Sequence, residues 1–472
     1  MEFDTKTKPY TTDDKSSFAY ISARDRWPVI LTQAIDDVFQ HTIASNDPKY
    51  TKEGKKIVEQ LAKLKYELQH DRLVTPLEDD GEDDIKGYNE ELEALGDTRW
   101  FTAPWLFIEC YMYRRIQVAM NLSTKWKSHD IFQVQKTTTF RSSLVAVLEL
   151  ASKYRQIVTT IEEPSEPILT PEQVAEKDKL LFIEMCEICL WGNATDLSLL
   201  TSLSYEDIQK LQGSEARKQN EKKVLANDLP AVYAMLDRLK HEGKKDRRVD
   251  IILDNSGFEL FVDLILGGYL LSTGLATEVV FHPKSLPWFV SDVLPKDFAD
   301  LLNALQDPAA YFTAPEESQK TVEPLTDVQK SDLGFLFSRW AQFHAEGQFV
   351  LRPNRFWTTA GSFWRLPRVA PALFEDLKQS ELCIFKGDLN YRKLTGDADW
   401  DPTTKFQEAI GPLGEQGSGI RVLALRTCKA DVVVGLPEGK DEELRSADEE
   451  GEGRKWAWSG KWAVVQFWDG VV

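Results

Sequence analysis

Several features that define other protein classes are scarce in this 472-residue sequence. Its five cysteines are few and odd in number, which excludes a disulfide-built scaffold and indicates a reducing compartment. Acidic residues outnumber basic ones by 76 to 57, and a net charge of −19 argues against nucleic-acid or anionic-membrane partners, because both bind basic patches. The longest apolar run, 260–276, contains an acid and two adjacent glycines, so we expect no membrane-spanning helix.

Other absences concern location and architecture. The N-terminal segment MEFDTKTKPYTTDDKSS has no apolar core for a secretory signal and is too acidic for a transit peptide, so the cytoplasm is the expected location and the nucleus a second one. No fixed period recurs along the chain, which disfavours a solenoid. What is present is typical of a globular protein, with 42% hydrophobic and 11% aromatic residues and 14 tryptophans. We expect a monomer.

The first part of the chain is predicted to be helical. RDRWPVILTQAIDDVFQHTIA has Pro28 in its first turn and apolar residues at helical spacing, and a second amphipathic pattern follows between Ile57 and Leu68. WFTAPWLFIECYMYRRI predicts a buried helix that starts near Pro104. The charge run LEDDGEDD at 77–84 is expected to be a solvated loop.

A further helix is predicted from Pro171, after the Pro- and Glu-rich connector EEPSEPILTPEQ. It carries Cys186-x-x-Cys189, which could indicate metal or redox chemistry. We interpret both cysteines as core residues, because no second cysteine pair or nearby histidine completes a site.

From about residue 226 the pattern changes to alternating helices and strands. Helix 229–240, strand 249–253, helix 258–271 and strand 277–281 follow one another, which implies an α/β fold with a parallel sheet. Further strand signals begin at Trp288, Gln348, Leu382, Arg421 and Asp431, and a last one lies in KWAVVQFW at 461–468.

Four patches place polar or charged side chains directly after a predicted strand. They are Asp254-Asn255-Ser256-Gly257-Phe258-Glu259, Ser291-Asp292, Gly387-Asp388-Leu389-Asn390-Tyr391-Arg392-Lys393, and Arg426-Thr427-Cys428-Lys429. The carboxyl ends of parallel strands converge on one edge of a doubly wound sheet, so all four can face a single crevice.

The first two patches supply oxygen ligands. Asp254, Asn255 and Asp292 suit Mg²⁺ or Mn²⁺ rather than zinc. Neighbours within a strand point to opposite faces, so Asp254 and Asn255 can share an ion only if a turn begins there. A simpler alternative stays open, because Ser256-x-x-Glu259 is also a capping box and DNSG is an ordinary turn sequence.

The two later patches supply positive charge. Asp388 to Lys393 brings a carboxylate, an amide and two cations to a predicted strand-to-helix turn, where an Asp or Asn helix cap with solvated basic residues is the simpler interpretation. Arg426 and Lys429 close the next strand. Two cations opposite a carboxylate-bound metal would form a phosphate clamp, although single basic residues in loops are usually surface groups.

Taken together, these motifs resemble those of the metal-dependent damage-control phosphatase family, also called domain of unknown function 89. The resemblance is carried by DNSGFELFVDLILGGYLL, WFVSD, KGDLNYRKL and RTxK, with RDRWPVIL, WFTAPWLFIECYMYRRI and LWGNATDLSLL upstream. It extends from about Arg24 to the end of the chain. The most similar branch ends in RTxK and includes the acidic residue methyltransferase proteins of eukaryotes.

The resemblance implies a helical N-terminal region, 1–225, and a Rossmann-like three-layer α/β/α catalytic domain, 226–472, with a mainly parallel sheet. It implies that Asp254, Asn255 and Asp292 are catalytic and hold a divalent metal, either Mn²⁺, Mg²⁺, Co²⁺ or Ni²⁺. The substrate-binding residues that it implies are Arg24, Asp25, Arg26, Glu259, Asp388, Leu389, Asn390, Tyr391, Arg392 and Lys429, with Asn193 and Asp196 as weaker matches.

The implied activity is metal-assisted hydrolysis of small phosphomonoesters, such as fructose 1-phosphate or fructose 6-phosphate, or of damaged phosphometabolites. Lys429 and Arg392 would neutralise the charge of the transition state. The sequence leaves open whether Asp254 attacks directly or positions a metal-bound water.

Two alternatives remain. The first is an S-adenosylmethionine-dependent protein-glutamate O-methyltransferase, an activity also attributed to this branch, although the turn DNSGFE has one glycine and is not a glycine-rich adenosine loop. The second is a catalytically silent scaffold, which would have a broken ligand set, whereas this sequence has all three candidate ligands.

Overall fold

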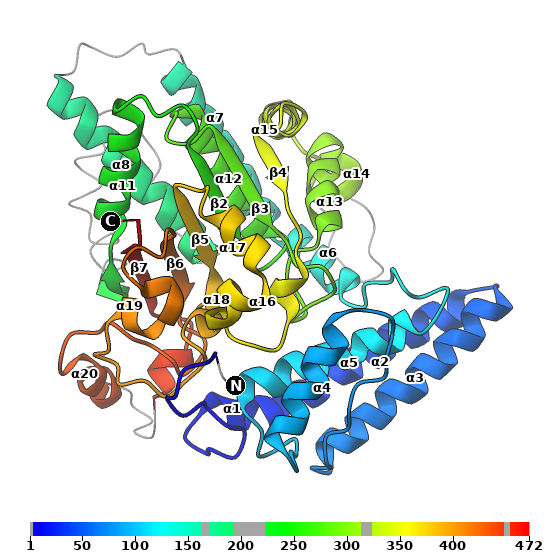
Figure 1. Ribbon diagram of the computed structural model, residues 1–472. Coiled ribbons are helices and arrows are strands. Elements are labelled where there is room, and N and C mark those ends of the chain that lie inside the picture. Colours follow the sequence, from blue (N-terminus) through cyan, green and yellow to red (C-terminus); the bar gives the residue numbers. More distant parts are fainter. Residues whose placement is uncertain (1–2, 163–169, 193–221, 313–322, 448–453, 472) are drawn as a thin grey trace.

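The computed structural model describes residues 3–162, 170–192, 222–312, 323–447 and 454–471. The blue N-terminal helices form a block that lies below a sheet flanked by further helices (Figure 1). Within the described ranges, we find no helix with the length and apolar character needed to cross a lipid bilayer.

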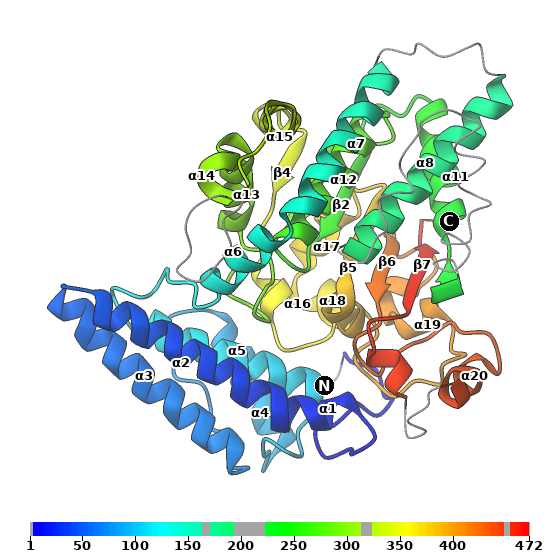
Figure 2. The same ribbon diagram turned by 180° about the vertical axis from the view of Figure 1, so that it is seen from behind.

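The helices of the N-terminal block begin where local signals predict them. A proline stands in the first turn of α2 and of α3, Asp47 caps α3 by accepting from the Lys49 backbone nitrogen, and Pro104 precedes α5. α2 and α3 pack as a helical hairpin (Figure 2). The helices of the block are α1 Phe18–Ile21, the π-helix η1 Ser22–Arg26, α2 Trp27–Ala44, α3 Pro48–Gln69, α4 Asp84–Leu95 and α5 Trp105–Asn121.

Seven strands form one sheet in the order β1-β7-β6-β5-β2-β3-β4. They are β1 Val224–Asn227, β2 Arg248–Ile252, β3 Glu278–His282, β4 Phe349–Leu351, β5 Leu382–Lys386, β6 Arg421–Thr427 and β7 Ala463–Asp469. The strands from β4 to β6 in this order are parallel, β7 is antiparallel to β6, and β1 is parallel to β7. The predicted mainly parallel sheet is therefore confirmed.

Alternation along the strands divides their apolar side chains between two cores. Ile251 and Ile384 belong to one core, and Ile252 and Phe385 belong to the other, which also contains the N-terminal helices. The helices around the first core are α7 Leu144–Glu162, α8 Pro171–Trp191, α11 Leu229–His241, α12 Phe258–Ser272, α13 Pro295–Gln306, α14 Pro308–Phe312 and α15 Asp327–Ala345.

The second face of the sheet carries shorter helices, which lie in front of it in Figure 1. These are α16 Leu366–Val369, α17 Pro371–Leu377, α18 Gly387–Leu394 and α19 Phe406–Ala409. Outside the two layers the structure also describes α6 Gln133–Ser142, α20 Lys440–Ala447, and the 3₁₀ turns η4 Arg355–Thr358, η5 Phe363–Arg365, η6 Gly411–Gly414 and η7 Lys455–Trp458. The three-layer α/β/α architecture is confirmed. Helices α7 and α8 from the first 225 residues contribute to it, and the domain boundary itself stays a prediction.

Two of the predicted strands are wrong. The segment from Trp288 contains Phe289 and Val290 with positive φ angles of 43° and 70°, so the chain turns there instead of extending. The segment from Asp431 is buried but pairs with no described strand.

The acidic run at 77–84 is only partly solvated, which corrects the prediction of a surface loop. The side chains of Asp80 and Asp84 are buried and form ion pairs with Arg114 of α5, whose side chain is fully buried. Arg114 Nη1 lies 2.7 Å from Asp80 Oδ2, and Arg114 Nε lies 2.8 Å from Asp84 Oδ2. A buried guanidinium needs such partners, because its isolated charge would be strongly destabilising.

Candidate active site

Two adjoining hollows lie at the carboxyl edge of the parallel strands. They are bordered by the segments after β2, β5 and β6 and by the loop after β3, and they share Asp254, Lys429 and Gly460. This is the edge where free backbone groups and strand-end side chains face a ligand in open α/β sheets. The predicted site residues that line the hollows are Arg26, Asp254, Asn255, Glu259, Asp292, Asp388, Leu389 and Lys429.

A turn directly after β2 places Asp254 beside the segment that carries Asp292. β2 ends at Ile252, and the Val293 backbone nitrogen donates to the Asp254 carbonyl oxygen at 2.9 Å. Asn255 and Asp292 form an isolated antiparallel bridge. Because the strand has ended, Asp254 and Asn255 both line the same hollow instead of pointing to opposite faces.

Asp254 and Asp292 are buried carboxylates, and acidic neighbours add to the effect of burial on Asp254. Burial, followed by the charges of Glu259 and Asp292, raises the pKa of Asp254 well above its usual range. Burial also raises the pKa of Asp292 to about 6, although Lys284 opposes the rise. Asp292 Oδ2 lies 3.3 Å from Lys284 Nζ without hydrogen-bond geometry. A further cation at the carboxylates would stabilise their charged forms.

The donor set fits a hard divalent cation. Carboxylate oxygens are the ligands that Mg²⁺ and Mn²⁺ prefer. Asn255 Nδ2 donates to Asp254 Oδ2 at 2.8 Å and to Glu259 Oε2 at 2.9 Å. The partly positive amide NH₂ group of Asn255 therefore already lies between two carboxylates. Asn255 Oδ1 accepts from Ser291 Oγ, so this oxygen can become a ligand only if the amide turns over.

The capping-box alternative for this turn is wrong. α12 begins after Gly257, whose φ is 69°, and no side chain of the described residues caps its first turn. Glu259 accepts from Asn255, and its Oε1 lies 3.7 Å from Lys386 Nζ. Glu259 therefore belongs to the wall of the hollow.

Gly387, the first residue of α18, lies directly against Asp254. Its φ is +79°, and a Cβ added there would lie 1.9 Å from Asp254 Oδ2. Only glycine leaves room for this carboxylate and adopts this backbone conformation without strain.

Asp388 and Arg426 shape the loop that carries Lys429. Asp388 Oδ1 accepts from Arg426 Nε at 2.8 Å and from the Lys429 backbone nitrogen at 2.9 Å, and it does not cap α18. Arg426 is fully buried, donates to the Ala430 carbonyl at 3.0 Å and lies 4.2 Å from the centre of the Tyr391 ring. Arg426 is thus bound within the protein, whereas Lys429 is exposed and lines both hollows.

Arg392 lies under the site and lines neither hollow. Its Nη1 donates to Glu109 Oε2 at 2.8 Å, its Nη2 donates to Asp397 Oδ2 at 2.8 Å, and its Cζ lies 3.7 Å from the centre of the Trp105 ring. These contacts join α18 to α5 of the N-terminal block. A direct contact of Arg392 with substrate stays a prediction.

Asn390 and Tyr391 also support the site from below. Asn390 Nδ2 donates to the Leu253 carbonyl at 3.2 Å and to the Lys386 carbonyl at 2.7 Å, which ties α18 to the end of β2. Tyr391 Oη donates to Gln466 Oε1 of β7 at 2.8 Å. Neither side chain lines the hollows.

The three residues Arg24, Asp25 and Arg26 lie in η1, and π-helical turns are frequent at functional sites. Arg26 is exposed and lines one hollow. Arg24 is turned away, since its Nη1 donates to the Thr12 carbonyl at 2.7 Å and its Cζ lies 3.6 Å from the centre of the Tyr20 ring. Asp25 is exposed and outside both linings. Asn193 and Asp196 lie outside the described residues.

Three buried lysines that the sequence analysis did not select hold this edge together. Lys284 donates to the Leu253 carbonyl at 2.7 Å, and Lys136 of α6 donates to the Asp292 carbonyl at 2.9 Å. Lys386 donates to Asp263 Oδ1 at 2.7 Å. Lys284 and Lys386 stand at or just after strand ends, which is a usable sequence signal, whereas Lys136 comes from a distant helix and carries no such signal.

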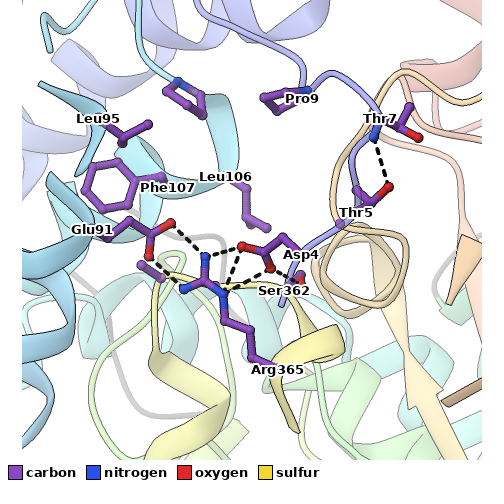
Figure 3. A pocket seen from close by; sticks show the side chains of 14 residues that line it. Asp4, Thr5, Thr7, Pro9, Glu91, Leu95, Leu106, Phe107, Ser362 and Arg365 are labelled. Atoms are coloured by element: carbon purple, nitrogen blue, oxygen red, sulfur yellow. Dashed lines mark hydrogen bonds and ion pairs between the residues drawn. The ribbon is translucent and has the colours of Figure 1, made fainter. Parts of the chain in front are cut away.

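Figure 3 shows another pocket, between the N-terminal segment, α4, α5 and η5. The cation in its lining is Arg365, whose guanidinium is held by Asp4 and Glu91, with Nη1 to Glu91 Oε2 at 2.7 Å and Nε to Asp4 Oδ1 at 3.0 Å. The charge of Arg365 is therefore satisfied inside the protein, and this pocket is a weaker candidate for a phosphate.

The chain is similar to known proteins along most of its length. The family model described as the damage-control phosphatase ARMT1-like domain matches residues 22–444. The damage-control phosphatase ARMT1 of Danio rerio is 35% identical over 484 residues, which cover 99% of this chain and 98% of its own. The protein of the same name from Homo sapiens is 35% identical over 468 residues, 96% of this chain and 97% of its own. A crystal structure of a DUF89 family protein from Pyrococcus horikoshii covers 86% of this chain and 90% of its own at 14% identity, with a TM-score of 0.33.

Proposed function

This chain belongs to the damage-control phosphatase ARMT1-like family, and from that premise we propose that it is a metal-dependent phosphatase that hydrolyses small phosphomonoesters at the hollows beside Asp254. The observation that carries the proposal is the meeting of two buried carboxylates, Asp254 and Asp292, with the exposed cation Lys429 around one crevice. A bound cation would stabilise the charged form of these buried carboxylates. Lys429 provides a positive charge for a phosphate oxygen.

In this proposal Asp254 and Asp292 hold a divalent ion, with Asn255 as a third ligand once its amide has turned. Bound there, the ion would withdraw charge from the phosphoryl oxygens. Lys429 binds a phosphate oxygen, and Asp388 fixes the Lys429 backbone so that the side chain stays in the crevice. Backbone N–H groups at the start of α12 add donors for the anion.

The substrate class follows from the family and from the walls of the hollow. We propose small sugar phosphates, such as fructose 1-phosphate or fructose 6-phosphate, as substrates. Leu389 and Phe289 form apolar wall next to Arg26 and Asp388, so the hollow offers both an apolar surface and hydrogen-bonding groups to a sugar.

A direct test is phosphate release from a panel of sugar phosphates by the full-length protein in Mg²⁺, Mn²⁺, Co²⁺, Ni²⁺ or excess chelator. We expect release with at least one of these ions and its loss in chelator, because the carboxylates cannot bind the phosphate without a cation. Release that persists in chelator would contradict the metal-dependent proposal. Methyl transfer from S-adenosylmethionine without phosphate release would support the methyltransferase alternative instead.

Removing the charge of Lys429 should weaken catalysis without affecting the fold. The Lys429→Met variant keeps the aliphatic stem and the backbone N–H that Asp388 binds, so we expect kcat/KM to fall by about 10²-fold, the loss of one charged contact to the phosphate. The thermal unfolding midpoint should stay within 2 °C of the wild-type value, roughly the effect of an exposed substitution.

Lys461→Met is the matched control. Lys461 is also exposed and follows Gly460 of the shared lining, but its own side chain is not part of the lining. We expect its kcat/KM to remain close to that of the wild type. Equal losses in both variants would mean that general surface charge, rather than Lys429 itself, attracts the phosphate.

A further inference from the structure

A second cluster of metal-ligand side chains lies on the N-terminal block. Asp37 and His41 are one turn apart on α2, and His129 comes from the loop between α5 and α6. One ligand atom from each residue lies within 4.8 Å of the others, and within the described ranges no other group of three histidine, cysteine or acidic side chains meets this distance. None of the three residues lines the candidate active site.

The hydrogen bonding of His41 prepares one nitrogen for a ligand. His41 Nδ1 lies 2.8 Å from the Asp37 carbonyl oxygen and 3.6 Å from Asp37 Oδ1, and both oxygens are acceptors, so these contacts favour the tautomer with its proton on Nδ1. The lone pair of the neutral ring is then on Nε2. Histidines that bind metals usually donate the other ring N–H to a carboxylate, a backbone carbonyl or a water molecule.

His129 is held in place from two sides. Its backbone nitrogen donates to the Trp126 carbonyl at 2.9 Å, and Trp126 is fully buried with its Nε1 bound to the Tyr50 carbonyl of α3 at 3.0 Å. The His129 ring lies 4.7 Å from the His41 ring, centre to centre, at 69°. His129 Nε2 lies 2.6 Å from Asp37 Oδ2, so an imidazole nitrogen and a carboxylate oxygen already meet.

The cluster is partly exposed, mainly at His41. The side chain of Asp37 is 9% exposed, that of His129 is 18% exposed, and that of His41 is 43% exposed. An ion could enter past His41 and would then be covered by the loop. Two imidazoles and one carboxylate leave a fourth position open in a tetrahedral shell.

We propose that Asp37, His41 and His129 form a second metal site that takes Zn²⁺ or another nitrogen-preferring transition ion. Imidazole ligands select such ions over Mg²⁺, whereas the carboxylates at Asp254 and Asp292 suit Mg²⁺ and Mn²⁺. The bound ion would fasten the loop that carries His129 to α2. The proposal concerns a separate site and does not depend on the proposed phosphatase activity.

The chain contains a natural control for this site. On α11, Asp237 and His241 have the same spacing, and His241 Nδ1 lies 2.9 Å from the Asp237 carbonyl and 3.3 Å from Asp237 Oδ1. Among the described residues no third ligand completes that pair. A comparison of His41 with His241 therefore isolates the contribution of His129.

The test measures Zn²⁺ affinity by competition with a chromophoric chelator, in full-length protein carrying Asp254→Asn to weaken binding at the active site. We expect one site in this background. His41→Ala or His129→Ala should weaken it by more than the roughly 10- to 100-fold that loss of a merely orienting partner costs, and His241→Ala should leave it unchanged. Equal affinity in the His129→Ala and His241→Ala proteins would overturn the proposal.

Cobalt provides an independent readout. Co²⁺ bound to the same background should give the visible absorption of a tetrahedral ion, and His129→Ala should abolish that band. If His129→Ala does not fold, His41→Ala serves in its place, because the His41 ring is 43% exposed on the surface of α2 and its loss should not affect folding. An absorption typical of octahedral Co²⁺ that is the same in all variants would also overturn the proposal.

Discussion

Replacement of Asp254 by asparagine is expected to reduce phosphate release by about 10³-fold or more. The substitution keeps the size of the side chain but removes a negative ligand, and a catalytic metal contributes several kcal/mol of charge stabilisation in the transition state. The measurement is kcat/KM for a sugar phosphate at saturating Mg²⁺ or Mn²⁺. Wild-type activity in this variant would exclude Asp254 both as a metal ligand and as a nucleophile.

Without metal, Asp254→Asn is expected to leave the stability of the protein unchanged or to raise it, whereas replacing a well-paired buried acid lowers stability. Burial, followed by the charges of Glu259 and Asp292, raises the pKa of Asp254, so the ionised carboxylate is unfavourable without a cation. Asp254→Asn should therefore unfold at the same or a higher temperature in chelator. Asp250 is the contrasting acid, since it lies in β2 with its oxygens bound by Arg248 and His282.

Asp250→Asn is expected to destabilise the protein by about 1 to 3 kcal/mol, because Arg248 loses one of its two carboxylate partners and keeps only Asp376. Chemical denaturation in chelator compares the two variants. If Asp254→Asn were as destabilising as Asp250→Asn, the carboxylate at 254 would be a structural partner and not a ligand awaiting a cation.

Replacement of Gly387 by alanine should be the most damaging change that removes no functional group. The added Cβ would lie 1.9 Å from Asp254 Oδ2 and 2.3 Å from Asp254 Cγ, so the carboxylate must move. A small displacement of a positioned group can cost about 10²-fold in rate, and we expect kcat/KM to fall by at least that factor.

Gly439→Ala separates this clash from backbone strain. Gly439 has the same φ of +79°, but an added Cβ there meets nothing within 4 Å. It should cost about 1 to 2 kcal/mol of stability, the penalty for a left-handed residue, and leave kcat/KM unchanged. Equal effects of the two alanines on activity would show that Gly387 is needed only for its φ.

The double variant Asp254→Ala with Gly387→Ala gives a second check. Alanine at 254 removes the two atoms closest to the new Cβ, but Asp254 Cβ would still lie 2.8 Å away. We therefore expect the stability loss from Gly387→Ala to be smaller in the Asp254→Ala background, although not abolished. Strictly additive losses would place the damage elsewhere.

Helix positions were largely predictable because their signals are local. Pro28 and Pro171 stand in the first turns of α2 and α8, and Pro104 directly precedes α5. Apolar spacing predicted the buried faces that follow. The parallel sheet followed from the alternation of helices and strands. Its common carboxyl edge, in turn, predicted which strand-end residues would be neighbours.

The segment from Asp431 shows why a buried apolar run need not be a strand. Its backbone groups are satisfied by side chains instead of by a neighbouring strand, since the Val432 carbonyl accepts from Arg426 and the Val434 carbonyl accepts from Gln466. Apolar character predicts burial, but the hydrogen-bond partners of a buried backbone come from elsewhere in the chain.

Local sequence signals also did not predict which way the charged side chains point. Arg392 and Lys429 both follow a strand in a basic motif, yet Arg392 turns inward to Glu109 and Asp397 while Lys429 faces the crevice. Glu109 lies far from Arg392 in the sequence, and Asp397 lies in the turn that follows α18. A motif specifies a residue type, whereas burial and available partners decide which way it points.

The sequence by itself determined which polar and charged groups stand at the strand ends. The apolar run before Asp254 and the motifs KGDLNYRKL and RTxK specify an α/β sheet with polar groups at one edge, because strand and turn preferences are local. The tertiary structure decided the rest: that Asp254 faces Asp292, that Gly387 makes room for it, and that Asp37 and His41 meet His129. Those juxtapositions depend on long-range packing, which local sequence does not encode.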